Sequence, residues 1–238
     1  MVSTEFPVLM PPGAEHWFGT DNLGRDLFAR ILSGGRVSLI VGLSVAVICL
    51  IFAIVIGGIA GFWGGWVDLI LNKVLEFFQV IPTIVLALVA AAMLGSTPTM
   101  IVLILGVTMW PPVARIMRAE AMRIRELGYI ESARSAGFSD MRIFLSDVVP
   151  NAFPPVLVTT TMTIGRAILL ESGLAFLGLG DANNPSWGAL LYTAQPYMQL
   201  AWWLTIIPGA CIFIVVLAMN MLGDNLNDSL NPTISRVK

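Results

Sequence analysis

The chain has 238 residues, of which 57% are hydrophobic and only 12% are charged, and its mean hydropathy is +0.84. Soluble domains carry about 25% charged residues, so this composition excludes an ordinary globular protein. It favours a helical membrane protein, in which the many Gly and Pro residues are also tolerated. The net charge of −2 gives no indication of a nucleic-acid partner.

Five apolar tracts are candidates to cross a hydrocarbon core, which needs roughly 20 helical residues. They are Val37–Phe62, Phe77–Leu94, Met100–Ala114, Ala152–Leu179 and Leu200–Leu222. The third tract is the shortest, and for it a helix buried in a protein core remains an alternative. Pro82 and Pro208 lie within tracts and are expected to kink them. The sequence therefore predicts an all-α, polytopic fold with about five spans.

The arginines predict the orientation, because positive charge accumulates on the cytoplasmic side. Residues 180–199 contain no Lys or Arg and are expected outside, whereas Arg236 and Lys238 place the C-terminus in the cytoplasm. Six arginines between the third and fourth tracts make that loop cytoplasmic: Arg115, Arg118, Arg123, Arg125, Arg134 and Arg142. We thus expect a multi-pass protein of the cell inner (plasma) membrane. Its parts are an external segment at 1–36, a transmembrane domain at 37–223 and a cytoplasmic tail at 224–238.

The external N-terminal segment conflicts with this rule. It carries Arg25, Arg30 and Arg36, yet it must cross the membrane with neither a signal peptide nor a preceding helix. An additional span upstream of this segment would remove the conflict. The alternative is a five-span protein whose N-terminus is translocated.

The sequence shows no catalytic or ligand-binding constellation. It contains no nucleophile elbow, no CxxC motif and no nucleotide-binding lysine motif. The single histidine, His16, cannot form a metal site, and Cys49 and Cys211 lie in apolar tracts as packing residues. We therefore expect that the chain is not an enzyme and that it holds no catalytic, cofactor-binding or metal-binding residues.

The polar segment at 115–150 contains a regular pattern. Glu131, Ser132 and Ala133 form an E-x-A triplet, Gly137 follows six residues after the Glu, and Pro150 follows thirteen after the Gly. The residues predict one short helix with an acidic first turn that stops at the glycine, and a second short helix after it. Ser139 is expected to cap the second helix, and Phe138 is expected to pack against Ile143 at its start. Pro150 and the following proline pair mark the return to the membrane. The arginine count alone fits a solvated basic loop equally well.

This spacing resembles the "EAA" loop of ABC-importer permeases. Three further stretches resemble the C-type subunit of the dipeptide, oligopeptide and nickel group. They are FGTDNLGRD at 18–26, ESGLAFLGLG with PSWG at 171–188, and GDNLNDSLNP at 223–232. Ser132 departs from the triplet, and Asn227 and Asn231 stand where relatives usually carry Arg and Asp. The family's first span, expected before residue 18, has no counterpart here, in line with an upstream span.

The resemblance implies the transmembrane domain of a type-1 ABC transporter. It also implies a second homologous permease subunit, an extracytoplasmic solute-binding protein and two cytoplasmic ATPases, which would bind the ATP and Mg while this chain binds no cofactor. The ATPases would be coupled through Glu131, Ser132, Ala133, Gly137 and Pro150. The expected solutes are di- and oligopeptides; nickel, other metal chelates and other small solutes remain alternatives.

Two charged residues lie within the fourth apolar tract. Arg166 and Glu171 are about 140° apart around a helix, so each needs its own partner. They either line the pathway or fix helix packing, whereas Lys73 and Glu76 form a local pair.

Other classes of membrane protein are less consistent with the sequence. An ion-coupled secondary transporter would often show repeated halves, and the sequence contains no internal repeat. An intramembrane enzyme would need paired catalytic residues, but the tracts contain no Asp or His. An assembly scaffold is the remaining alternative.

Overall fold

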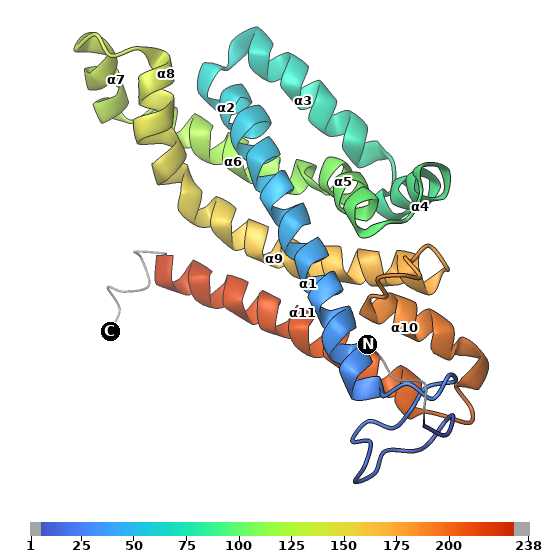
Figure 1. Ribbon diagram of the computed structural model, residues 1–238. Coiled ribbons are helices and arrows are strands. Elements are labelled where there is room, and N and C mark those ends of the chain that lie inside the picture. The colour runs from blue at the N-terminus through green and yellow to red at the C-terminus, as the bar shows by residue number, and fades with distance from the viewer. Residues whose placement is uncertain (1–5, 231–238) are drawn as a thin grey trace. The chain divides into compact units, whose positions relative to one another are not determined.

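The computed structural model describes residues 6–230, in which a non-helical segment at 6–26 precedes a series of helices, with no strand beyond one isolated bridge (Figure 1). In chain order the helices are α1 (Leu27–Phe52), η1 (Ala53–Gly58), α2 (Ile59–Trp63), α3 (Gly65–Val80), α4 (Thr83–Leu94), α5 (Pro98–Met109), α6 (Pro111–Arg125), α7 (Gly128–Ser135), α8 (Asp140–Ile143), η2 (Phe144–Val148), α9 (Val149–Phe176), α10 (Trp187–Ala194), η3 (Gln195–Tyr197) and α11 (Trp203–Leu230). The all-α prediction is confirmed. Asn231, Pro232, Arg236 and Lys238, used above for the tail and the orientation, lie outside the described residues.

Three continuous helical stretches are long and apolar enough to cross a membrane: Leu27–Trp63, Asp140–Phe176 and Trp203–Leu230. Two bent pairs also qualify when each is taken as one span. Helices α3 and α4 meet at 81°, and α5 and α6 meet at 44°. The number of candidate spans is therefore three, or up to five if both bent pairs cross.

The largest bend lies at Pro82, as expected. Ile81 has extended backbone torsions, because a proline disfavours the helical conformation in the residue before it. The second apolar tract is therefore not one helix. It joins the end of α3, which also contains Asp68, Lys73 and Glu76, to α4. Lys73 Nζ and Glu76 Oε2 lie 2.7 Å apart, which confirms the local pair.

The described chain divides into two compact units. The first contains residues 6–43, 87–104 and 165–218, and the second contains residues 44–86, 105–164 and 219–230. Residues of α1, α9 and α11 belong to both units.

In the first unit, Asp21 organises the segment before α1. Asp21 is 4% exposed, and its carboxylate accepts hydrogen bonds from the backbone N–H groups of Leu23 at 2.8 Å and Arg25 at 2.9 Å. It also pairs with the guanidinium groups of Arg25, at 2.7 Å, and Arg30. Burial alone would raise the pKa of this carboxyl, but the hydrogen bonds outweigh it, and the pKa of Asp21 lies below its ordinary value. The arginines that conflict with an external location are thus partly neutralised within the segment.

The start of α1 follows from Asp26. Its Oδ2 accepts a hydrogen bond from the backbone N–H of Ala29 at 2.9 Å, and its Oδ1 lies 3.1 Å from Nδ1 of His16. A carboxylate in this position satisfies one of the free N–H groups of the first turn. The helix consequently begins at Leu27, ten residues before the apolar tract at Val37.

In the second unit, α6 crosses closely over η1 and α2. A Cβ atom on Gly57 would lie 2.2 Å from the carbonyl oxygen of Ala114, and one on Gly61 would lie 2.3 Å from that of Arg118. This Gly-x-x-x-Gly spacing lets two helix backbones approach each other. Any side chain at either glycine would separate the helices, so the position of α6 depends on them.

Candidate functional site

Charged side chains fix α6 in the second unit. The guanidinium of Arg118 forms a bidentate pair with the carboxylate of Asp68, with Nη2 donating to Oδ2 at 2.6 Å. Arg125 donates from Nη1 to the carbonyl oxygen of Gly61 at 3.1 Å, at the end of α2. Bidentate pairs of this kind combine charge with a defined geometry. They hold the helix that leads directly into the E-x-A triplet.

The triplet lies on α7, a helix of eight residues. Glu131 is in its first turn, as expected, and Glu131 and Ser132 are exposed while Ala133 is half-buried. Ile130 is fully buried and anchors the opposite face. The hydroxyl of Ser132 donates to the carbonyl oxygen of Gly128 at 2.9 Å, so the serine is accommodated within the helix. One face of α7 is thus fixed in the unit and the other is available to solvent.

Gly137 ends α7 in a Schellman motif. Its φ is +83°, which is a left-handed conformation that favours glycine. The N–H of Gly137 donates to the carbonyl of Arg134 at 2.9 Å, and the N–H of Phe138 donates to that of Ala133 at 3.2 Å. These two bonds define the motif. The predicted helix stop is confirmed.

The second predicted helix differs from expectation. A short helix was expected after Gly137, but the helix beginning at Asp140 continues through η2 and α9 to Phe176. Pro150 lies within it, as the second residue of α9. The π-helical turn η2 ends at Val148, two residues before Pro150. It interrupts the α geometry where the proline ring would otherwise clash with the carbonyl four residues earlier.

The start of this long helix was anticipated only in part. Ser139 occupies the N-cap position, but its hydroxyl makes no capping hydrogen bond. Phe138, expected to pack against Ile143, is 44% exposed and lies under the guanidinium of Arg142 at 4.3 Å. Ile143 is fully buried without it.

Apolar side chains also point to solvent on this bend. We call the exposed face of residues 128–143 the α7–α8 surface. Tyr129 is 46% exposed and Met141 is 53% exposed. Arg134 holds the bend to the unit, because its guanidinium lies 5.3 Å from the ring centroid of Phe62 and its Nε donates to Asp140 at 3.1 Å. A fixed bend with exposed charge and apolar area is suited to binding another protein.

The two charges of the fourth tract have different surroundings in the first unit. Glu171 is 6% exposed, and its carboxylate accepts hydrogen bonds from the hydroxyls of Ser38 at 3.3 Å and Ser172 at 3.4 Å. The Ser38 hydroxyl also accepts from the backbone N–H of Trp187 at 3.3 Å. Glu171 thus joins α1, α9 and the start of α10. Arg166 is exposed, and its side chain makes no hydrogen bond or ion pair with any residue between 6 and 230.

This difference gives a prediction about stability. Glu171→Ala should lower the free energy of unfolding by about 1–3 kcal/mol, because it leaves buried serine hydroxyls unpaired. Arg166→Ala should change it by less than about 0.5 kcal/mol. Thermal unfolding of the detergent-solubilised protein would measure both. Equal destabilisation by the two variants would contradict a packing role specific to Glu171.

Several of these contacts could not be predicted from the sequence. The Asp68–Arg118 pair joins residues 50 positions apart, and the Ser38–Glu171 bond joins residues 133 positions apart. Only the two glycines at 57 and 61 gave a local signal, through their Gly-x-x-x-Gly spacing. Cys49 and Cys211 are free, and Cys49 is buried, in line with a packing role.

Comparison with known proteins identifies the family. The model of the "Binding-protein-dependent transport system inner membrane component" family matches residues 53–236. The chain belongs to this family. It is 43% identical over 225 residues to a peptide transport system permease protein of Brucella suis, covering 94% of this chain and 76% of that one. It is 38% identical to the dipeptide transport system permease protein DppC of Alkalihalophilus pseudofirmus, covering 94% and 74%.

The fold agrees with that of solved transporters. The membrane subunit in a structure of the MetNI methionine ABC transporter superposes with a TM-score of 0.64 at 16% identity, covering 86% of this chain and 98% of that one. At this identity the likeness concerns the fold alone. Family and fold together confirm that the chain is a membrane permease subunit of an ABC importer, which is a transport component.

Proposed function

We propose that this permease subunit forms, with a second homologous permease, the pathway for di- and oligopeptides across the cell inner membrane. The observation that carries the solute class is the 43% identity, over 94% of the chain, to a peptide permease. Further relatives at 35–38% identity carry dipeptide, D,D-dipeptide and glutathione names. An extracytoplasmic binding protein delivers the peptide, and two cytoplasmic ATPases bind ATP and Mg.

The α7–α8 surface is the contact with one ATPase in this proposal. Glu131, Ser132 and Ala133 lie on its first helix, and Gly137 fixes the bend. Pro150 lies in the long helix that runs from the bend to Phe176. A movement of the ATPase would therefore act on a continuous helix and shift the spans between outward-open and inward-open states. Glu171 fixes helix packing in this proposal, and the exposed Arg166 is the charge that could line the pathway.

The experiment is purification of the tagged chain from its own cells in mild detergent, followed by uptake of a labelled dipeptide in proteoliposomes. Recovery of a second permease and ATPases, together with ATP-dependent uptake when the binding protein is present, would support the proposal. A stable lone membrane protein without ATPase would contradict the assembly. An intact complex that fails to transport peptides would contradict the solute class.

The proposed orientation gives a separate prediction. A reporter fused after Lys238 should give a cytoplasmic signal. The arginines of α6 to α8 place residues 115–150 inside, and the two spans that follow return the chain to the same side. A reporter inserted at Asn183, in the turn between α9 and α10, should give an external signal. Activity of a dual topology reporter, measured in whole cells, distinguishes the two. The opposite pair of signals would invert the topology.

A further inference from the structure

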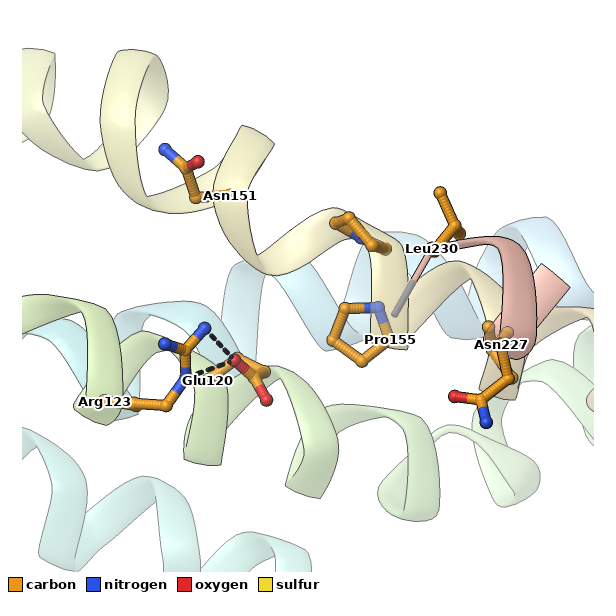
Figure 2. A pocket seen from close by; sticks show the side chains of 8 residues that line it. Glu120, Arg123, Asn151, Pro155, Asn227 and Leu230 are labelled. Carbon is orange, nitrogen blue, oxygen red and sulfur yellow. Dashed lines mark hydrogen bonds and ion pairs between the residues drawn. The ribbon is translucent and has the colours of Figure 1, made fainter. Parts of the chain in front are cut away.

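A cavity of about 380 Å³ with a mixed polar and apolar lining lies in the second unit, in the size range of small-molecule sites (Figure 2). It is bordered by three helices that are distant in sequence. Its lining consists of Glu120 and Arg123 from α6, Asn151, Pro154, Pro155 and Val158 from α9, and Asn227 and Leu230 from α11. Nothing in the coupling role of α7 and α8 requires this cavity.

The cavity contains one charge of each sign. Glu120 and Arg123 lie one helical turn apart, with Arg123 Nη2 2.8 Å from Glu120 Oε2. Figure 2 shows this pair on α6 beside the proline-bearing stretch of α9. The Arg123 side chain is 61% exposed, and that of Glu120 is 24% exposed. Pairs of this spacing contribute little to stability when they are exposed, so Arg123 can turn to a ligand at low cost.

Two neutral amides complement the charges. The Asn151 side chain donates from Nδ2 to the carbonyl of Asp147 at 2.6 Å, which leaves its Oδ1 as an acceptor. The side chain of Asn227 makes no hydrogen bond within residues 6–230, so both its N–H groups and its oxygen are available. Figure 2 shows the two amides on different helices around the cavity.

The proline pair adds backbone acceptors. Because Pro154 and Pro155 lack N–H groups, the carbonyls of Pro150 and Asn151 cannot receive the usual hydrogen bonds from four residues ahead. Carbonyl groups without a helical partner favour a cationic or N–H-bearing ligand. Of these two residues, Asn151 lines the cavity and can contribute a backbone acceptor, while Arg123 and Asn227 offer donors.

We propose that this cavity binds the two ends of a short zwitterionic peptide, with Glu120 receiving its ammonium group and Arg123 receiving its carboxylate. The inference rests on the proposed peptide solute and names residues that recognise it. One internal ion pair is exchanged for two pairs with the ligand, and the volume accommodates a molecule of dipeptide size. In the proposed orientation the cavity faces the cytoplasm, where it holds the peptide before release.

The test is equilibrium dialysis of labelled alanyl-alanine against the purified complex without its binding protein. Glu120→Gln and Arg123→Gln should each weaken binding about ten-fold, as expected for the loss of one charge-assisted hydrogen bond. The matched controls are the single variants Lys73→Gln and Glu76→Gln, each of which breaks an exposed pair of the same spacing on α3. Both variants should leave peptide binding unchanged.

Blocked peptides distinguish direct contact from an indirect effect. Glu120→Gln should have no further effect on binding of N-acetyl-alanyl-alanine, and Arg123→Gln should have none on alanyl-alanine amide. Unchanged binding of alanyl-alanine in both variants would overturn the site while peptide uptake by the unaltered complex would still support the proposed function. A complex that neither transports nor binds the dipeptide would overturn both.

Discussion

Replacing Gly137 with proline is expected to reduce ATP-driven uptake to background while the protein still inserts into the membrane. Gly137 has φ +83°, whereas proline requires about −65°. The substitution also removes the N–H that bonds to Arg134 at 2.9 Å. The Schellman motif cannot form, so the bend that sets the α7–α8 surface is lost. The hydrogen bonds that are lost lie within residues 133–138, so insertion of the spans is expected to persist.

The measurement compares dipeptide uptake in proteoliposomes with the amount of ATPase that copurifies. Gly137→Asp should give a smaller loss, because an L-residue in this conformation costs roughly 1–2 kcal/mol and Asp tolerates it better than most. Gly128→Ala is the matched control, since Gly128 has no positive φ and open space around its Cβ position. Normal uptake by Gly137→Pro would refute the coupling role of this bend.

Asp21→Ala is expected to destabilise the segment before α1 by about 3–5 kcal/mol, as in other buried ion pairs from which one partner is removed. Arg30 is 6% exposed, and the substitution leaves its charge buried without the carboxylate that it now pairs with. The backbone N–H groups of Leu23 and Arg25 lose the same acceptor. Limited proteolysis and thermal unfolding in detergent would show the loss. Glu15→Ala, at an exposed position of the same segment, should have little effect.

The same cluster predicts a response to pH. The pKa of Asp21 lies below the ordinary carboxyl value of about 3.9. Stabilisation from this group is therefore complete above the ordinary value and is lost only as the pH falls through the lower pKa of the folded state. We expect protease resistance of the segment to be constant from neutral pH to about pH 5. Loss of resistance between pH 7 and pH 5 in the unaltered protein, absent in Asp21→Ala, would contradict this assignment.

The amino-acid sequence by itself determined the features that depend on local composition. The low charge and long apolar tracts indicate membrane spans, and the Glu131 triplet with Gly137 predicts a short helix and its stop. Four motif segments in order identified the permease family, which the family match confirms. These properties are local because span length and helix termination depend on neighbouring residues.

The boundaries of the spans were only partly accessible from the sequence. Apolarity predicted a helix from Val37, but α1 begins at Leu27. The bend of the second tract at Pro82 was expected from the proline, whereas its angle of 81° was not. A polar cap extends a helix beyond its apolar part, and hydropathy does not register it. Likewise, the continuous helix through Pro150 depends on a π-helical turn that composition does not reveal.

Only the tertiary structure decided which distant residues meet. It brings Ser38 to Glu171 and leaves Arg166 exposed, although the sequence does not indicate which of the two charged residues is buried. It also collects Glu120, Asn151 and Asn227 around one cavity. Such contacts follow from packing of whole helices, and their partners lie tens to more than a hundred positions apart. Local propensity carries no information about them, because side-chain proximity across helices is set by packing and crossing geometry.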